Sequence, residues 1–166
     1  MVRVTSERIT VEAFVDGREC DRIPELNLTH YQTWLQTWLQ AMEPGLSPIN
    51  AYEISLRLTD DREIQQLNSH YRQQSKPTDV LSFAALETEM PGAEDIYRQQ
   101  PLPLGDIIIS IDTAARQAQQ ANHTLAKEVA WLTAHGFLHL LGWDHPDDDS
   151  LTRMLDQQTH LINLLA

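Results

Sequence analysis

Cysteine, positive charge and long apolar runs are all scarce in this chain of 166 residues. The one cysteine, Cys20, can form no internal disulfide and supplies no cysteine-rich zinc site, which fits a reducing compartment. Lysine and arginine total 12 against 24 acidic residues, so the net charge is −12. This balance disfavours general nucleic-acid binding, and any RNA contact must rest on local cations.

Membrane-spanning and secretory segments are not expected either. No apolar run approaches the roughly 20 residues that cross a bilayer, and residues 1–14 alternate polar and apolar without a signal-peptide h-region. We therefore expect a cytoplasmic protein without membrane contact. The length suits one domain over residues 1–166, and the apolar fraction of 42% is enough for a packed core.

The spacing of apolar residues predicts an α+β fold, in which a small mixed sheet packs against a central buried helix. The predicted strands cover residues 2–15, 51–59, 80–83 and 105–111. The predicted helices cover residues 28–42, 114–122 and 124–141, together with one that Thr59 or Asp60 caps and a last one that Asp147, Asp148 or Asp149 caps. Residues 86–103 hold three prolines and four acids, which favours a long mobile loop.

Two of these helices are predicted to be amphipathic. In the helix that follows residue 60, one apolar face is formed by Ile64, Leu67 and Tyr71. In the last helix, the residues expected to point inward are Leu151, Met154, Leu155, Ile162 and Leu165.

Three of the seven histidines, His135, His139 and His145, fall within eleven residues. His135 and His139 are four apart, about 40° around a helix axis, so their imidazoles share one face. Gly142 permits a positive φ, which lets the chain double back and bring His145 to the same place. Three unrelated core histidines are the alternative, but two buried imidazoles without a shared partner would be costly.

Three neutral imidazoles suit zinc and leave its fourth tetrahedral position open for water, as in catalytic sites. The pattern His-x3-His-x5-His, with glycine at its eighth position, resembles the zinc motif of metzincin proteases. Those enzymes need a glutamate after the first histidine as general base, and here the residue is Gly136. The spacing therefore predicts one zinc per chain but removes the protease mechanism.

The residues from His135 to His145 read H-G-F-L-H-L-L-G-W-D-H, which resembles the motif H-G-x-L-H-L-x-G-Y-D-H of the YbeY family of bacterial endoribonucleases. Trp143 replaces the tyrosine. Two further blocks resemble that family in order: Leu67-Asn68, Tyr71-Arg72 and the residues Pro77–Phe83, then Leu104-Gly105-Asp106-Ile107 with Ile109-Ser110. Gln158 stands where the family often has glutamate, a departure expected to touch the last helix and not the ligands.

The resemblance implies zinc on His135, His139 and His145 and the hydrolysis of RNA. We assign the catalytic roles to Arg72 and His135. A guanidinium at Arg72 would bind phosphate oxygens bidentately, whereas the alternative is a solvated residue at a helix end. Asp144 is expected to orient a ligand histidine or to form the turn, and Asp79 to hydrogen-bond its own turn.

Three functions stay open at this point. The first is a zinc-dependent, single-strand-specific endoribonuclease of ribosomal RNA maturation, with processing of the 16S rRNA 3′ end and ribosome quality control. Its partners would be single-stranded RNA, ribosomal RNA and the small ribosomal subunit, with no organic cofactor. The second is a zincin-type metallopeptidase. The third is a non-catalytic, zinc-stabilised ribosome-binding module, which a fourth protein ligand from Asp144 or Asp147 would favour.

Overall fold

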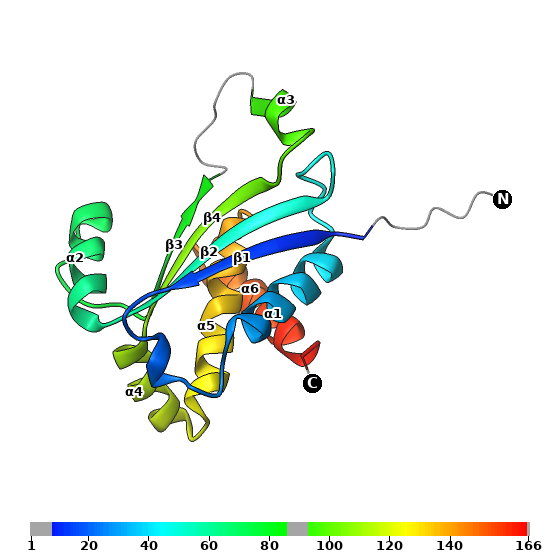
Figure 1. Ribbon diagram of the computed structural model, residues 1–166. Helices are drawn as coiled ribbons and strands as arrows, with labels where there is room; N and C mark the ends of the chain where they lie inside the picture. The colour runs from blue at the N-terminus through cyan, green and yellow to red at the C-terminus, as the bar shows by residue number, and fades with distance from the viewer. Residues whose placement is uncertain (1–7, 86–92, 166) are drawn as a thin grey trace.

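A four-stranded mixed sheet forms the centre of the computed structural model, which describes residues 8–85 and 93–165 (Figure 1). The strand order is β1-β2-β4-β3; β1 and β4 run parallel to β2, and β3 is antiparallel to β4. The strands are β1 (Thr10–Asp16), β2 (Ala51–Thr59), β3 (Val80–Ala84) and β4 (Leu102–Ser110). The helices are α1 (Leu28–Met42), α2 (Asp61–Arg72), α3 (Ala93–Tyr97), α4 (Ile111–Ala121), α5 (Leu125–Leu140) and α6 (Asp148–Asn163), with a 3₁₀ turn at Cys20–Arg22.

The two faces of the sheet are covered unequally. The main core joins α1, α5 and the inward side chains of β1, β2 and β4, among them Ile54, Leu56 and Ile107. On the other face, a small separate cluster is formed by Ile64 of α2 with Leu81 and Ile108. Figure 1 shows α2 standing apart from α1, α5 and α6. The predicted α+β fold is therefore confirmed, including its mixed sheet and central helix.

Helix α5 is the central buried helix, and ten of its sixteen residues are buried. Thr124 caps its start, because its side chain accepts a hydrogen bond from the backbone N–H of Lys127. Gly136 allows the helix to lie close against the sheet. A Cβ at this position would lie 2.7 Å from Ile107 Cγ2 and 2.9 Å from Ser82 Oγ. The glycine therefore sets how near the histidine-bearing helix comes to β3 and β4.

The prediction of a loop over residues 86–103 is wrong for residues 93–103. Residues 93–103 include α3 and the first residues of β4, whereas residues 86–92 lie outside the described residues. The proline in β4, Pro103, is tolerated because the register shifts beside it, with Glu53 opposite Pro103 and Ile54 opposite Gly105. Of the predicted first strand, residues 10–15 lie in β1, whereas residues 8 and 9 precede it; residues 1–7 lie outside the described residues.

Two side chains that the sequence places on apolar helix faces are exposed. Tyr71 is 53% exposed and Leu155 is 38% exposed. Tyr71 lies in the last turn of α2, where it contacts the Phe83 ring edge-on at 5.2 Å rather than entering a core. In the described part of the chain, no helix is long and apolar enough to cross a membrane.

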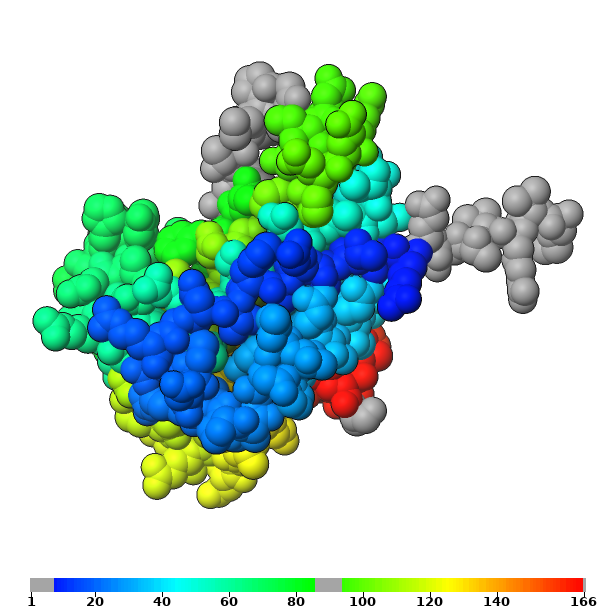
Figure 2. Space-filling view, in the orientation of Figure 1, coloured from blue at the N-terminus to red at the C-terminus, as the bar shows by residue number. Residues whose placement is uncertain are grey.

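The outer edge of β1 is covered by glutamine side chains from α1. Gln40 and Gln32 accept hydrogen bonds from the backbone N–H groups of Ile9 and Ala13. Gln32 also donates to the carbonyl of Val11, and Gln36 donates to that of Ile9. These glutamines are spaced four residues apart, so they lie on one face of the helix. Figure 2 shows the atoms of β1 lying against those of α1 at the surface.

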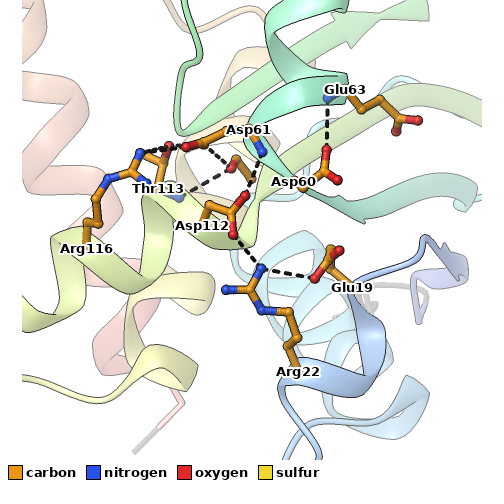
Figure 3. Close-up of polar contacts among 9 residues, drawn as sticks. Glu19, Arg22, Asp60, Asp61, Glu63, Asp112, Thr113 and Arg116 are labelled. Atoms are coloured by element: carbon orange, nitrogen blue, oxygen red, sulfur yellow. Dashed lines mark hydrogen bonds and ion pairs between the residues drawn. The ribbon is translucent and has the colours of Figure 1, made fainter.

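Polar contacts join the starts of α2 and α4 at one end of the sheet (Figure 3). Asp61 accepts hydrogen bonds from the hydroxyls of Ser110 and Thr113 and pairs with Arg116 at 2.9 Å. Asp112 accepts from the backbone N–H of Asp61 and pairs with Arg22 at 2.6 Å. The carboxylate of Asp61 thus contacts the start of α4, and that of Asp112 contacts the start of α2. Negative charge is favoured at the N-terminus of a helix.

Candidate metal centre

The end of α5 determines where the third histidine lies. Gly142 has φ +96, and its N–H bonds the carbonyl of His139 at 3.0 Å. The N–H of Trp143 bonds the carbonyl of Leu138 at 3.0 Å, which completes a Schellman cap. The chain then reverses, so that His145 approaches the two histidines on the helix.

The three predicted histidines are brought together. The Nε2 atoms of His135 and His139 are 3.1 Å apart, and one ligand nitrogen from each of the three residues lies within 4.8 Å of the others. The ring centroid of His145 lies 5.5 Å from that of His135 and 5.4 Å from that of His139. His135 and His139 are half-buried, and His145 is exposed. Three converging nitrogens, one of them from an exposed residue, fit a metal ion that keeps a position for substrate or water.

Burial favours the neutral, metal-binding form of the two helix histidines. Loss of hydration lowers the pKa of His135 and that of His139 below the ordinary value of imidazole. For His135, the hydrogen bond with Gln158 opposes this effect, and for His139 a backbone hydrogen bond with Trp143 does so. Lone pairs on both rings are therefore available at neutral pH.

Gln158 touches a predicted ligand, which the sequence-based interpretation missed. Its Oε1 lies 3.2 Å from His135 Nδ1, although the departure at this position was expected to leave the ligands untouched. That expectation is wrong because α6 packs along α5 and directs the side chain of Gln158 toward the ring. The available signal was a polar residue between Met154 and Leu161 on the buried stripe of α6.

Position 136 offers no place for a protease-type base. A side chain there would be directed against the sheet, since its Cβ would already lie 2.7 Å from Ile107 Cγ2 and 2.9 Å from Ser82 Oγ. Asp144 forms the turn: its Oδ1 accepts a hydrogen bond from the backbone N–H of His145 at 2.8 Å. Asp79 likewise accepts from the N–H of Val80 at 2.8 Å, as predicted for its own turn.

Arg72 lies at the end of α2, exposed, beside β3. Its Nη2 donates to the carbonyl of Ser82 at 2.9 Å, and its guanidinium lies over the Phe83 ring. Within residues 8–85 and 93–165, no hydrogen bond or ring contact joins Arg72 to the three histidines. Arg57, another cation close in sequence, is already paired with Glu63 at 2.8 Å. Among the described residues, Arg72 therefore engages fewer of its N–H donors than Arg57 does, which leaves more of them for a phosphate.

The fold and the site together define an α+β protein with a cluster of three histidines that could hold a metal ion. The sequence profile described as Endoribonuclease YbeY matches residues 19–166. The chain belongs to this family.

Curated relatives and a solved structure agree with this assignment. The chain is 56% identical to the endoribonuclease YbeY of Nostoc sp. over 136 residues, covering 82% of this chain and 73% of that protein. It is 48% identical to that of Picosynechococcus sp. over 151 residues, covering 91% of each. The solution structure of TM1509 from Thermotoga maritima superposes with a TM-score of 0.58 at 25% identity, covering 92% of this chain and 88% of that one.

Proposed function

We propose that this chain is a zinc-dependent, single-strand-specific endoribonuclease that acts in ribosomal RNA maturation. The observation that carries the proposal is the convergence of His135, His139 and His145, with one nitrogen of each within 4.8 Å, in a chain of the YbeY family. Processing of the 16S rRNA 3′ end, ribosome quality control, the small subunit as partner and a cytoplasmic location belong to the same proposal.

The three histidines would hold the ion, since imidazole nitrogen is a preferred ligand of zinc and burial lowers the pKa of two of these rings, which favours their neutral form. When bound, zinc supplies a Lewis acid that polarises a phosphoryl oxygen and makes water available as a nucleophile near neutral pH. Arg72 would bind the phosphate through its planar fork of donors. Among the described residues, the group that could hold a metal ion comprises His135, His139 and His145 and does not include Asp144, which disfavours it as a fourth ligand.

Cleavage of an unstructured single-stranded RNA, before and after metal removal, tests the proposal. Chelated protein should be inactive, and stoichiometric zinc should restore cleavage. The same strand annealed to its complement should stay intact, and casein should not be hydrolysed. Chelator-sensitive casein hydrolysis with RNA untouched would instead favour a peptidase. Zinc binding without either activity would favour a binding module.

A further inference from the structure

The side chain of Gln158 lies between the backbone carbonyl of Trp131 and the ring of His135, both on α5, and the residue is 1% exposed. Its Nε2 donates a hydrogen bond to the backbone carbonyl of Trp131 at 2.9 Å, and its Oε1 lies 3.2 Å from Nδ1 of His135. Both ends of this buried amide are therefore used, one on the helix backbone and one on a ligand ring. Buried amides held at both ends have a fixed orientation.

The orientation of the amide determines which nitrogen of His135 carries the proton. A carbonyl oxygen cannot donate, so the Trp131 carbonyl requires the NH₂ group of Gln158. The Oε1 atom is then left facing His135, and an oxygen acceptor requires a donor, so the proton sits on Nδ1. In a neutral imidazole the other nitrogen, Nε2, then holds a lone pair. This Nε2 is the atom that lies 3.1 Å from Nε2 of His139.

We propose that Gln158 is a positioning residue of the metal centre, which fixes His135 in the Nδ1–H tautomer and so presents Nε2 to zinc. The proposal rests on the proposed metal site and adds the group that orients its first ligand. Groups that hold the second nitrogen of a ligand histidine commonly change metal affinity 10–100-fold when removed.

The chain's use of glutamine rather than glutamate has a local reason. An ionised glutamate could accept from His135 Nδ1, but it has no proton to donate to the Trp131 carbonyl. The neutral amide satisfies both groups at once in a buried position, where an unpaired charge would be costly. Gln158→Glu therefore keeps the contact to the ligand and loses the contact to the backbone, whereas Gln158→Leu loses both.

Nuclear magnetic resonance of the ¹⁵N-labelled, metal-free protein reads the tautomer directly. Long-range ¹H–¹⁵N correlations of the imidazoles should show His135 protonated on Nδ1 in the parent and in Gln158→Glu. In Gln158→Leu this preference should be lost. Gln157→Leu is the matched control, because the neighbouring Gln157 bonds Met42 Sδ at 3.0 Å and does not touch a ligand. An unchanged His135 tautomer in Gln158→Leu would overturn the proposal.

Competition with a chromophoric chelator gives the zinc affinity of the same proteins. Gln158→Leu should bind zinc about 10–100-fold more weakly than the parent, whereas Gln158→Glu and Gln157→Leu should stay within about threefold or, for the glutamate, bind more tightly. A purely structural role predicts instead that the buried charge of Gln158→Glu weakens zinc binding about tenfold or more relative to the parent. That result would overturn the proposal even if Gln158→Leu failed to fold, because it compares Gln158→Glu with the parent alone.

Failure of this inference and failure of the proposed function give different results. If the parent cleaves no RNA but its zinc affinity depends on Gln158, the positioning role is supported and the endoribonuclease function is excluded. A parent that cleaves RNA with zinc, while Gln158→Leu keeps parental zinc affinity, removes the positioning role alone.

Discussion

Arg72 is joined to Ser82 by a hydrogen bond of 2.9 Å from its Nη2 to the backbone carbonyl, which ties the end of α2 to β3. The side chain of Ser82 faces Gly136, since its Oγ would lie 2.9 Å from a Cβ at that position. One strand residue therefore separates the guanidinium from the helix that bears His135 and His139. A phosphate held by Arg72 would lie beside this strand.

Arg72→Ala should fold and bind zinc as the parent does. Its rate of RNA cleavage should fall about 10²-fold or more, because preorganised positive charge stabilises the transition state. The stability cost should be about 0.5–1 kcal/mol, for one exposed hydrogen bond and one cation–π contact. Arg72→Lys should rescue cleavage in part, since a point charge lacks the bidentate fork. Single-turnover cleavage and melting temperature measure these effects.

Arg62→Ala is the control for Arg72, because Arg62 is an exposed arginine of the same helix. It should leave cleavage unchanged. Parental cleavage by zinc-loaded Arg72→Ala would reduce Arg72 to a solvated helix-end residue, and Lys76 or Arg57 would become the candidates for the phosphate contact.

His139→Ala should bind no stoichiometric zinc, because two remaining imidazoles cannot complete a three-ligand site. Elemental analysis after dialysis gives the metal content. His160→Ala, which removes an exposed histidine near the end of α6, should retain the parental content of about one zinc per chain. Full zinc occupancy in His139→Ala would contradict the assignment of the three histidines as the metal ligands.

Gly136→Ala should lower the free energy of unfolding by up to about 2 kcal/mol. Overpacking against Ile107 and Ser82 costs about 1–3 kcal/mol, and the gain in helix propensity offsets about 1 kcal/mol of that cost. Urea denaturation of the metal-free proteins gives the difference. Adding Ser82→Ala removes one of the two close atoms and should recover part of the loss. An alanine variant more stable than the parent would show that α5 can move away from the sheet freely.

Asp61 should contribute stability that disappears in acid. Burial on its own would raise its pKa, but hydrogen bonds from Thr113 and Ser110 and the pairing with Arg116 outweigh this and lower it. A folded-state pKa below the unfolded value of about 3.9 gives stability that is present above that pH and is lost as the pH falls through the folded pKa.

Asp61→Asn should therefore cost about 1–2 kcal/mol at pH 7, as expected for hydrogen bonds to a charged group at a partly exposed site. The difference from the parent should shrink below about pH 4. Urea midpoints of the metal-free proteins between pH 7 and pH 3 measure it. Asp95→Asn, at an aspartate whose side chain is 87% exposed, is the control. A difference that stays constant with pH would exclude the charge of Asp61 as its origin.

Local patterns in the sequence predicted the parts of the site that depend on local geometry. The spacing of His135 and His139 follows from the helical repeat, and Gly142 adopts the positive φ that the reversal toward His145 requires. Gln158 could not be found in this way, because it meets His135 across 23 residues through the packing of α6 on α5. Apolar periodicity shows which face of α6 is buried, but it does not show which side chain of α5 lies against Gln158.

The fold was predictable to a similar extent. Alternation of apolar residues located β2, whose predicted and observed bounds agree, because the strand is long and regular. The start of β4 was missed because Pro101 and Pro103 suggested a loop, whereas the shift in register accommodates Pro103. The order of the strands depends on contacts between distant segments, so no local pattern contained it.

The glutamines of α1 on the edge of β1 have a consequence for association between molecules. An uncovered edge strand offers a row of free N–H and C=O groups, on which another chain can add a strand and begin aggregation. Here Gln32, Gln36 and Gln40 occupy backbone groups of Ile9, Val11 and Ala13. Growth of the sheet past β1 would first have to displace these side chains, so we expect the helix to disfavour the addition of another strand along that edge.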